Sequence, residues 1–290
     1  RAHPRPVGRD GRDRFVGRRG TAMTGWADLE RELDAWAAAG RCATLWWRDD
    51  DAVEASDVLD RLLELATTVA ARPLPVALAV IPMRASAGLA RRLEETPATG
   101  VLLHGFAHVN HAPPGDKKAE FGAHRPPEPM LAEITAGRDR LTDLFGKRAL
   151  PVLVPPWNRV ASGIVNRLGE ARVTGLSTYG PRAARHPAPG MTQVNTHIDV
   201  IDWHSGRGFV GASIALHLAV GHLAQRRQRS VDPDEPTGLL THHLVHDPET
   251  SAFLATFFAR TAAHPAAVWL AAADVFVQGP GTTPGAARPA

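Results

Sequence analysis

The sequence has very little cysteine: Cys42 is the only one among 290 residues. A single cysteine excludes an internal disulfide framework and is typical of proteins that fold in a reducing compartment. The chain also lacks an apolar run approaching the roughly 20 residues that a membrane helix needs, so no membrane span is predicted. Hydrophobic residues at 44% and charged residues at 22% are ordinary for a globular protein.

Basic residues are scarce in the body of the chain, although the sequence pI is near 9.6. Seven of the 33 basic residues and two of the 30 acidic residues lie in residues 1–22, which leaves 26 basic and 28 acidic residues elsewhere. The rest of the chain contains no basic stripe with interleaved aromatic residues. This pattern argues against nucleic acid as a partner.

The two ends of the chain have the composition of disordered segments. Residues 1–22 are rich in Arg, Gly and Pro, residues 279–290 are rich in Gly, Pro and Ala, and neither has apolar periodicity. The first segment lacks the apolar region of a secretory signal, and Met23 follows it directly. We therefore predict a single folded domain over 23–278, a natural start at Met23 and a cytoplasmic location.

Between these ends, short apolar runs alternate with segments of helical periodicity. The predicted strands are 43–48, 75–81, 101–103, 150–154, 174–177, 193–203, 238–241 and 267–270. The predicted helices are 26–39, 57–69, 84–95, 130–145, 160–171, 211–227 and 248–262, and 110–129 is predicted to be a surface loop. This alternation predicts a parallel α/β architecture.

Polar residues follow the carboxyl ends of these predicted strands. In (β/α) barrels, that rim is where active sites are built, and a single barrel-like domain is therefore expected. The residues at the strand ends are Asp49, Asp50, Asp51, His104, Pro156–Arg159, Asp202 and His242.

The first two of these groups together predict a metal site. Three adjacent carboxylates, Asp49 to Asp51, repel one another and resist burial, so they need solvent or a compensating cation. His104 and His108 have a spacing that places two imidazoles on the same side of a helix or tight turn. A solvated acidic turn or a core histidine explains either feature alone. Together, two imidazoles and a carboxylate leave coordination positions for water and substrate, as a catalytic zinc-type site requires.

The order of the motifs resembles the polysaccharide deacetylase family, also called the NodB-homology group or carbohydrate esterase family 4. Each motif is short, but the set spans most of the body in the family's order. The resemblance implies a deformed (β/α) barrel, a divalent metal that is usually zinc, and removal of acetyl groups from N-acetyl sugars. The matching segments are Asp50-Asp51, His104 with His108, Pro155-Pro156-Trp157, Asp202-Trp203 and Leu240-Thr241-His242.

The resemblance also implies roles for individual residues. Asp51, His104 and His108 would bind the metal, and Asp50 would be the general base. His242 would be the general acid, with Asp202 supporting it and Trp203 lining the acetyl pocket. A shift of one residue would instead make Asp49 the base and Asp50 the ligand, and His243 is an alternative to His242.

One departure from the family concerns the base. The family has an arginine before the Pro-Pro motif that holds the base carboxylate, but this chain has Val154 there. Arg48 and Arg159 are the two candidates for that role, and surface ion pairing is the alternative for each. The substrate is left open by this departure, whereas the predicted metal site is not affected.

Four further residues are predicted to contact the sugar: Trp157, Asn158, Trp203 and His111. The alternative is rim packing for the two tryptophans and simple solvation for His111. Lys117, Lys118 and Glu120 are predicted to belong to a solvated loop, with a lid over the site as the alternative.

We therefore expect a metal-dependent deacetylase of an N-acetylated sugar in a glycan, glycolipid or small glycoconjugate. The missing export signal favours a cytosolic precursor over a cell-wall polymer. Two other classes are a metal-dependent hydrolase of a phosphoester or non-sugar amide, and a non-catalytic glycan-binding module. The sequence predicts no oligomeric state.

Overall fold

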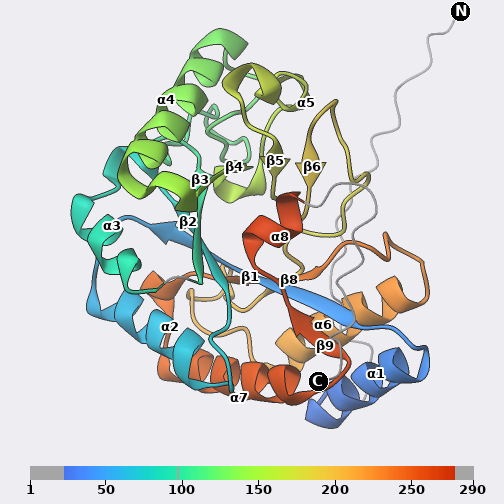
Figure 1. Ribbon diagram of the computed structural model, residues 1–290. Helices are drawn as coiled ribbons and strands as arrows, with labels where there is room; N and C mark the ends of the chain where they lie inside the picture. The colour runs from blue at the N-terminus through green and yellow to red at the C-terminus, as the bar shows by residue number, and fades with distance from the viewer. Residues whose placement is uncertain (1–22, 97, 278–290) are drawn as a thin grey trace, which may run out of the picture.

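The paired strands of the sheet are all parallel (Figure 1), and the residues of the predicted site lie at or just after the carboxyl ends of several of them. The computed structural model describes residues 23–96 and 98–277, so the predicted disordered segments 1–22 and 279–290 lie outside the described residues. The strands are β1 (Ala43–Ala52), β2 (Val76–Val80), β3 (Thr99–His104), β4 (Ala149–Val154), β5 (Gly175–Leu176), β6 (Thr192–Gln193), β7 (Ile198–Asp199), β8 (Thr237–Thr241) and β9 (Ala267–Trp269).

Helices connect these strands and cover the outside of the sheet, as Figure 1 shows for α2, α3, α4 and α7. The helices are α1 (Trp26–Ala38), α2 (Asp57–Thr68), α3 (Ala87–Glu94), α4 (Pro127–Phe145), α5 (Ser162–Val165), α6 (Ala212–Arg227), α7 (Pro248–Ala263) and α8 (Ala272–Val277). Short 3₁₀ turns are η1 (Pro82–Arg84), η2 (Gly146–Arg148), η3 (Pro156–Asn158), η4 (Leu168–Ala171) and η5 (His243–Val245).

The sheet curls into an incomplete barrel. Its strand order is β6-β5-β4-β3-β2-β1-β8-β7, and β9 pairs with the first residues of β1. Among the described residues, the terminal strands β6 and β7 do not pair with each other, so the barrel stays open there; an isolated bridge joins Tyr179, which follows β5, to Thr196, which lies between β6 and β7. The predicted α/β fold, a deformed (β/α) barrel in one domain, is confirmed.

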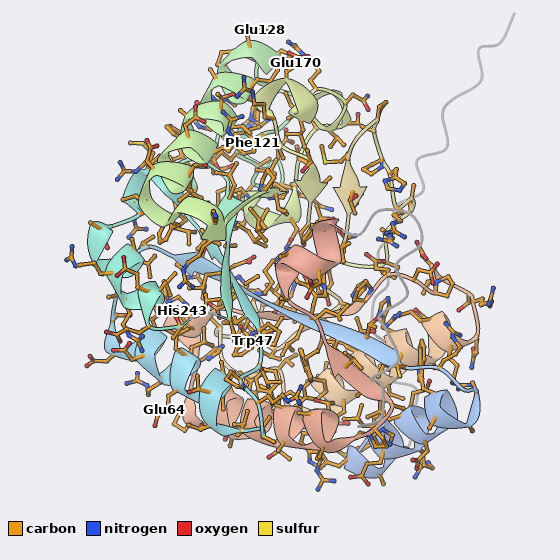
Figure 2. All side chains as sticks on the ribbon, in the orientation of Figure 1. Trp47, Glu64, Phe121, Glu128, Glu170 and His243 are labelled. Atoms are coloured by element: carbon orange, nitrogen blue, oxygen red, sulfur yellow. The ribbon has the colours of Figure 1, made fainter. Side chains whose placement is uncertain are left out.

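The hydrophobic core has two layers because successive strand residues point to opposite faces of the sheet. Trp47, Leu78 and Leu103 belong to the large layer beneath the helices, and Figure 2 shows Trp47 in the interior. Trp46 and Ala79 belong to a smaller layer on the other face. The α8 helix, which the sequence did not predict, packs residues into this second layer.

Local signals account for several helix boundaries. The Ser56 side chain accepts a hydrogen bond from the backbone of Leu59 and caps α2, as predicted. The predicted helix 160–171 is wrong, because only the short α5 and η4 form there. Gly163 and Gly169 lower the helix propensity of this segment, and Arg172 ends it in a left-handed conformation.

Two strand predictions also differ from the structure. The predicted strand 193–203 is divided into β6 and β7, with Asn195 and Thr196 between them. The first strand is longer than predicted and includes the three aspartates, with an irregularity in its pairing between Asp49 and Ala52. None of the helices in the described part of the chain has the length and apolar character required to span a bilayer.

Candidate metal and catalytic site

The end of β1 sends its polar side chains in three directions. Arg48 and Asp50 are two residues apart and share one face, whereas Asp49 points to the opposite face. Asp51 has a φ of 72°, in the left-handed region, which turns it out of this alternation. The local backbone therefore separates three carboxylates that are adjacent in sequence.

Asp49 is fully buried and anchors the segment after β8. Its carboxylate accepts hydrogen bonds from the Thr241 hydroxyl, the His243 backbone and the His243 ring. Burial alone disfavours the charged carboxylate, but His243 outweighs this effect and lowers the pKa of Asp49. Figure 2 shows His243 inside the molecule. These contacts give Asp49 and His243 a structural position, and they support Asp50 and Asp51 as the pair at the site.

Asp50 is held by Arg48 through both carboxylate oxygens. The Nε and Nη2 atoms of Arg48 donate to Asp50 at 2.8 and 3.0 Å, and both side chains are buried. The same guanidinium donates to Ser177 Oγ at 2.6 Å and to Asn158 Oδ1 at 3.0 Å. A bidentate pair with these further bonds fixes the orientation of the carboxylate.

Arg159, the other candidate for this role, lies elsewhere. Its side chain is exposed and donates to the backbone carbonyl of Lys118 at 2.9 Å. Of the two candidates, Arg48 is therefore the one that contacts Asp50.

Asp51, His104 and His108 converge on one point. The Nε2 atoms of His104 and His108 lie 3.1 and 3.3 Å from the same oxygen of Asp51. The Nδ1 atom of His104 donates to the Val154 carbonyl at 3.0 Å, which leaves the lone pair on Nε2. Ligand atoms of all three residues lie within 4.8 Å of one another, as a bound metal requires.

The charges of this group favour a cation. Burial alone disfavours the charged form of both His104 and Asp51. The carboxylates of Asp50 and Asp51 outweigh this effect at His104 and raise its pKa. The hydrogen bond between Asp51 and His104 lowers the pKa of Asp51. Burial and the neighbouring His104 lower the pKa of His108. A divalent metal would replace the protons that these carboxylates otherwise attract to the imidazoles.

The turn that joins the two histidines depends on a glycine and a buried glutamate. Gly105 has a φ of 61°, and a Cβ there would lie 2.0 Å from Glu120 Oε2 and 2.6 Å from Pro156. Glu120 accepts hydrogen bonds from the backbone of Phe106 and Ala107 at 3.1 and 2.8 Å. The prediction that Glu120 is solvated is therefore wrong: it is buried because its carboxylate satisfies the turn.

Backbone strain is concentrated around this group. Seven described residues other than glycine have a positive φ, and four of them lie here: Asp51, His108, Trp157 and Asn158. Such conformations cost about 1–3 kcal/mol each and persist where the surrounding structure enforces them, often at functional sites. The Trp157 ring packs against His108 with 4.6 Å between ring centroids. Trp157 and Asn158 thus adjoin the metal candidates, whereas His111 is exposed and its side chain forms no hydrogen bond or ion pair among the described residues.

His242 lies near the metal candidates, with Trp203 and Asp199 beside it. The Trp203 ring meets the His242 ring edge-on at 4.6 Å, and its Nε1 donates to Asp199 at 2.9 Å. Burial raises the pKa of Asp199, and the charge of His242 opposes this shift. The Nδ1 atom of His242 is buried and has no hydrogen-bond partner among the described residues.

Asp202 does not share this environment. It is only partly buried, and its carboxylate accepts hydrogen bonds from the backbone of His204 and Ser205 in a turn. The structure therefore places Asp199 where the sequence motif suggested Asp202. Sequence reasoning missed Asp199 because the predicted strand ran to residue 203, whereas β7 ends at Asp199.

Comparison with solved structures identifies the fold. A Mycobacterium smegmatis protein assigned as a polysaccharide deacetylase superposes with a TM-score of 0.56 at 16% identity, covering 80% of this chain and 87% of the other. The chain has the polysaccharide deacetylase fold. The fold that the sequence resemblance implied is thereby confirmed.

Two more distant deacetylase structures are similar over comparable parts of this chain. The Bdellovibrio bacteriovorus peptidoglycan deacetylase Bd3279 has a TM-score of 0.48 at 11% identity, covering 81% of this chain and 55% of its own. Bacillus subtilis PdaA, a family 4 carbohydrate esterase, has a TM-score of 0.47 at 10% identity, covering 85% and 88%. No protein-family model and no curated protein sequence matches this chain.

A second group of potential ligands lies inside the deacetylase fold. His197, His222 and Glu235 are all buried, and the two imidazole rings stack 3.5 Å apart at 15°. The lone pairs of nearly parallel stacked rings lie in two separate, nearly parallel planes, which does not favour their meeting at one metal. The His197 Nδ1 atom also accepts a hydrogen bond from the backbone of Gly238, which ties this group to β8. We therefore regard it as part of the packed interior.

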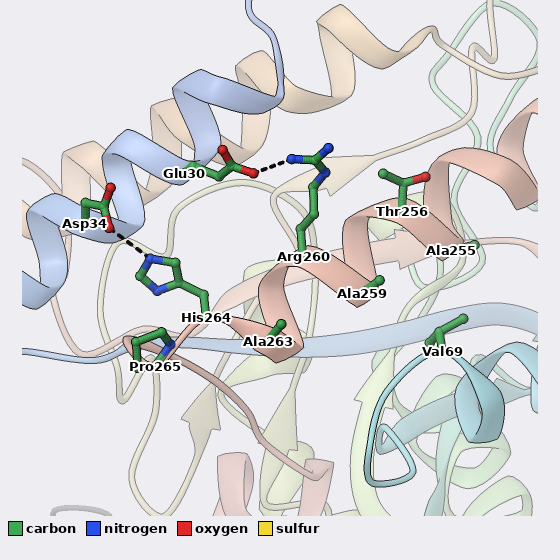
Figure 3. A pocket seen from close by; sticks show the side chains of 10 residues that line it. All are labelled: Glu30, Asp34, Val69, Ala255, Thr256, Ala259, Arg260, Ala263, His264 and Pro265. Carbon is green, nitrogen blue, oxygen red and sulfur yellow. Dashed lines mark hydrogen bonds and ion pairs between the residues drawn. The ribbon is translucent and has the colours of Figure 1, made fainter.

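One surface pocket is lined by none of these groups. It is a hollow of about 920 Å³ at the surface beside α1 and α7 (Figure 3). Its charged side chains are paired with one another, Glu30 with Arg260 and Asp34 with His264. The candidate metal site remains the rim around Asp51, His104 and His108.

Proposed function

We propose that this protein is a metal-dependent deacetylase that hydrolyses the N-acetyl amide of a sugar. The observation that carries the proposal is the convergence of His104 and His108 on Asp51, with the Arg48-held Asp50 in the adjacent position. The deacetylase fold supports this assignment because its strand ends present those residues on one rim. Glycans, glycolipids and small glycoconjugates are the substrate classes proposed.

A divalent metal, with zinc as the first choice, would be held by Asp51, His104 and His108. The nitrogen and oxygen donors are those that zinc prefers in catalytic sites with three protein ligands. When bound, the metal supplies Lewis acidity that activates water and polarises the amide carbonyl. The remaining chemistry falls to side chains of this chain.

Asp50 is the proposed general base. A carboxylate next to the ligand group can accept the proton of the attacking water while Arg48 keeps both of its oxygens oriented. Arg48 is a positioning residue in this scheme because it acts through Asp50. The Ser177 and Asn158 contacts hold Arg48 itself.

His242 is the proposed general acid, which gives a proton to the leaving amine. Trp203 packs against its ring, and Asp199 fixes Trp203 through the indole nitrogen. The charge of Asp199 also favours the imidazolium that precedes proton transfer. We propose that Asp199 supports the acid in place of Asp202.

The test combines metal analysis with acetate release from N-acetylglucosamine oligomers. Asp51→Ala and His104→Ala should lose stoichiometric metal and activity, whereas His222→Asn, in the buried second group, should retain both. Asp50→Asn should keep the metal and lose most of the activity, about 10²-fold or more for a general base. Retention of full metal content by both ligand variants would refute the site. If the variants lose metal but the metal-loaded wild type releases no acetate, the site would stand and the proposed reaction would be refuted.

A further inference from the structure

Two cations flank Trp157 without a carboxylate partner in the described part of the chain. The Nζ atom of Lys118 lies 6.0 Å from the centre of the Trp157 ring, and Arg159 donates to the Lys118 carbonyl. Both cations are exposed. Asp116, the acidic residue of the same loop, forms no ion pair with either among the described residues.

The backbone holds these two cations in fixed relation. Phe121 and Val160 form a parallel bridge, and the Ala161 amide donates to the Phe121 carbonyl at 2.8 Å. Buried Glu120 ties the segment after Lys118 to the turn that carries the metal-site histidines. A site whose charges are already positioned loses less entropy on binding than a mobile surface cluster.

A cavity of about 480 Å³ opens beside Arg159, within the size range of small-molecule sites. None of its lining residues is acidic. Arg159 is its only charged residue, and several of the other side chains carry hydrogen-bond donors. Among the polar residues that line the cavity are Asn158, Ser162, Asn166, Thr178 and Gln193.

Several hydrogen-bond donors that line this cavity are not used by other protein groups in the part of the chain that the structure describes. Asn158 uses its oxygen to accept from Arg48, so its amide nitrogen remains available for a ligand. The side chains of Ser162 and Asn166 contact no hydrogen-bond partner among the described residues. A guanidinium with amide and hydroxyl donors, and without a carboxylate, matches an anion of several oxygens.

The cavity also adjoins the proposed reaction centre. Asn158 contacts the arginine that holds Asp50, and the preceding residue, Trp157, packs against His108. A substrate seated at the metal candidates can therefore extend past Trp157 toward Arg159. An acidic group there would stay apart from the carboxylates of Asp50 and Asp51, which repel it.

We propose that this cavity is a subsite for an anionic group of the substrate, a phosphate or carboxylate carried by the N-acetyl sugar or its neighbouring residue. Arg159 supplies the charge within the cavity, Lys118 adds a cation beside the Trp157 ring, and Asn158 aligns the group with the reaction centre. The inference rests on the proposed deacetylase function for its setting, but anion binding can be measured separately.

The experiment compares three probes: N-acetylglucosamine, N-acetylglucosamine 1-phosphate and N-acetylmuramic acid. The two acidic probes distinguish phosphate from carboxylate. Wild type should show a kcat/KM at least about tenfold higher for one acidic probe, consistent with a charge-assisted hydrogen bond. The Lys118→Met and Arg159→Met double variant should lose this preference, and raised salt should weaken it in the wild type. The matched control is Lys147→Met. Lys147 is exposed and precedes the amino end of β4, away from the cavity, so this variant should retain the preference.

Calorimetry on the metal-free protein separates this inference from the deacetylase assignment. If no probe is deacetylated, tighter binding of an acidic probe that the double variant abolishes would still support the subsite. Equal handling of all three probes by the wild type, or an unchanged preference in the double variant, would overturn it.

Discussion

Arg48 and Asp50 lie two residues apart on β1, and the guanidinium of one contacts both carboxylate oxygens of the other at 2.8 and 3.0 Å. The alternation of a strand makes this pairing possible, because residues i and i+2 share a face. The cation that orients the proposed base is thus supplied by the strand that bears the base. This arrangement explains how the site dispenses with an arginine at Val154.

Replacing Arg48 by lysine should lower kcat by about 10²-fold, because a lysine keeps the charge but cannot hold both oxygens of Asp50. The measurement is steady-state deacetylation together with thermal unfolding. Arg226→Lys is the matched control, since Arg226 is equally buried but contacts Thr44, Thr237 and Pro233. It should lose stability while keeping kcat. An equal loss of kcat in both variants would show that the effect of Arg48 is merely structural.

Asp199 and Asp202 give a second matched pair. Asp199→Asn should reduce kcat by about 10- to 100-fold, because it removes the charge beside His242 that favours its protonated form. Asp202→Asn should change kcat less than about twofold, because Asp202 only accepts backbone hydrogen bonds in an exposed turn. Kinetics under saturating substrate would decide between the two aspartates. A larger loss for Asp202→Asn would restore the role that the motif suggested.

The strand ends were predictable from sequence because apolar runs of β1, β3 and β8 stop abruptly at polar residues. That pattern placed Asp51, His104 and His108 on one rim, where the structure brings them together. Sequence also named Arg48 as a candidate partner of the base. It could not decide between Arg48 and Arg159, because that choice depends on side-chain direction rather than on position in the chain.

Other features depend on contacts between distant segments and could not be predicted. Glu120 looks like a solvated loop residue until the unpaired backbone amides of Phe106 and Ala107 are known. Asp199 was missed because the run that ends in Val200, Ile201, Asp202 and Trp203 predicted a strand to residue 203. The chain instead folds back after β7, with Ile201 bridged to Phe209, and only tertiary pairing reveals that boundary.

Gly105→Ala should destabilise the protein by about 2–4 kcal/mol and weaken metal binding, because both the positive φ and the Glu120 contact oppose a Cβ. Equilibrium denaturation and metal titration measure the two effects. Gly221→Ala, within α6 and with nothing within 4 Å of the added Cβ, is the control. It should stabilise the protein by about 0.5–1 kcal/mol. Unchanged metal affinity in Gly105→Ala would separate the turn from the metal site.

The stacked pair His197 and His222 should make the protein sensitive to acid. Burial is the main cause that lowers the pKa of both, to about 2 for His222. An unfolded histidine has a pKa near 6.5, so below that pH the unfolded chain binds protons that the folded chain excludes. The free energy of unfolding is therefore unaffected by these groups above about pH 6.5 and falls as the pH decreases.

Each of the two histidines should contribute a slope of up to about 1.4 kcal/mol per pH unit below that point. His222→Asn should remove one such contribution, which urea denaturation at pH 4 to 7 can measure. The slope of the variant must be compared with that of the wild type, because carboxylates such as Asp49 also change the free energy of unfolding at acid pH. His217→Asn, an exposed position on the same helix, should keep the wild-type slope. A wild-type slope in His222→Asn would mean that the buried ring takes up its proton in the folded state.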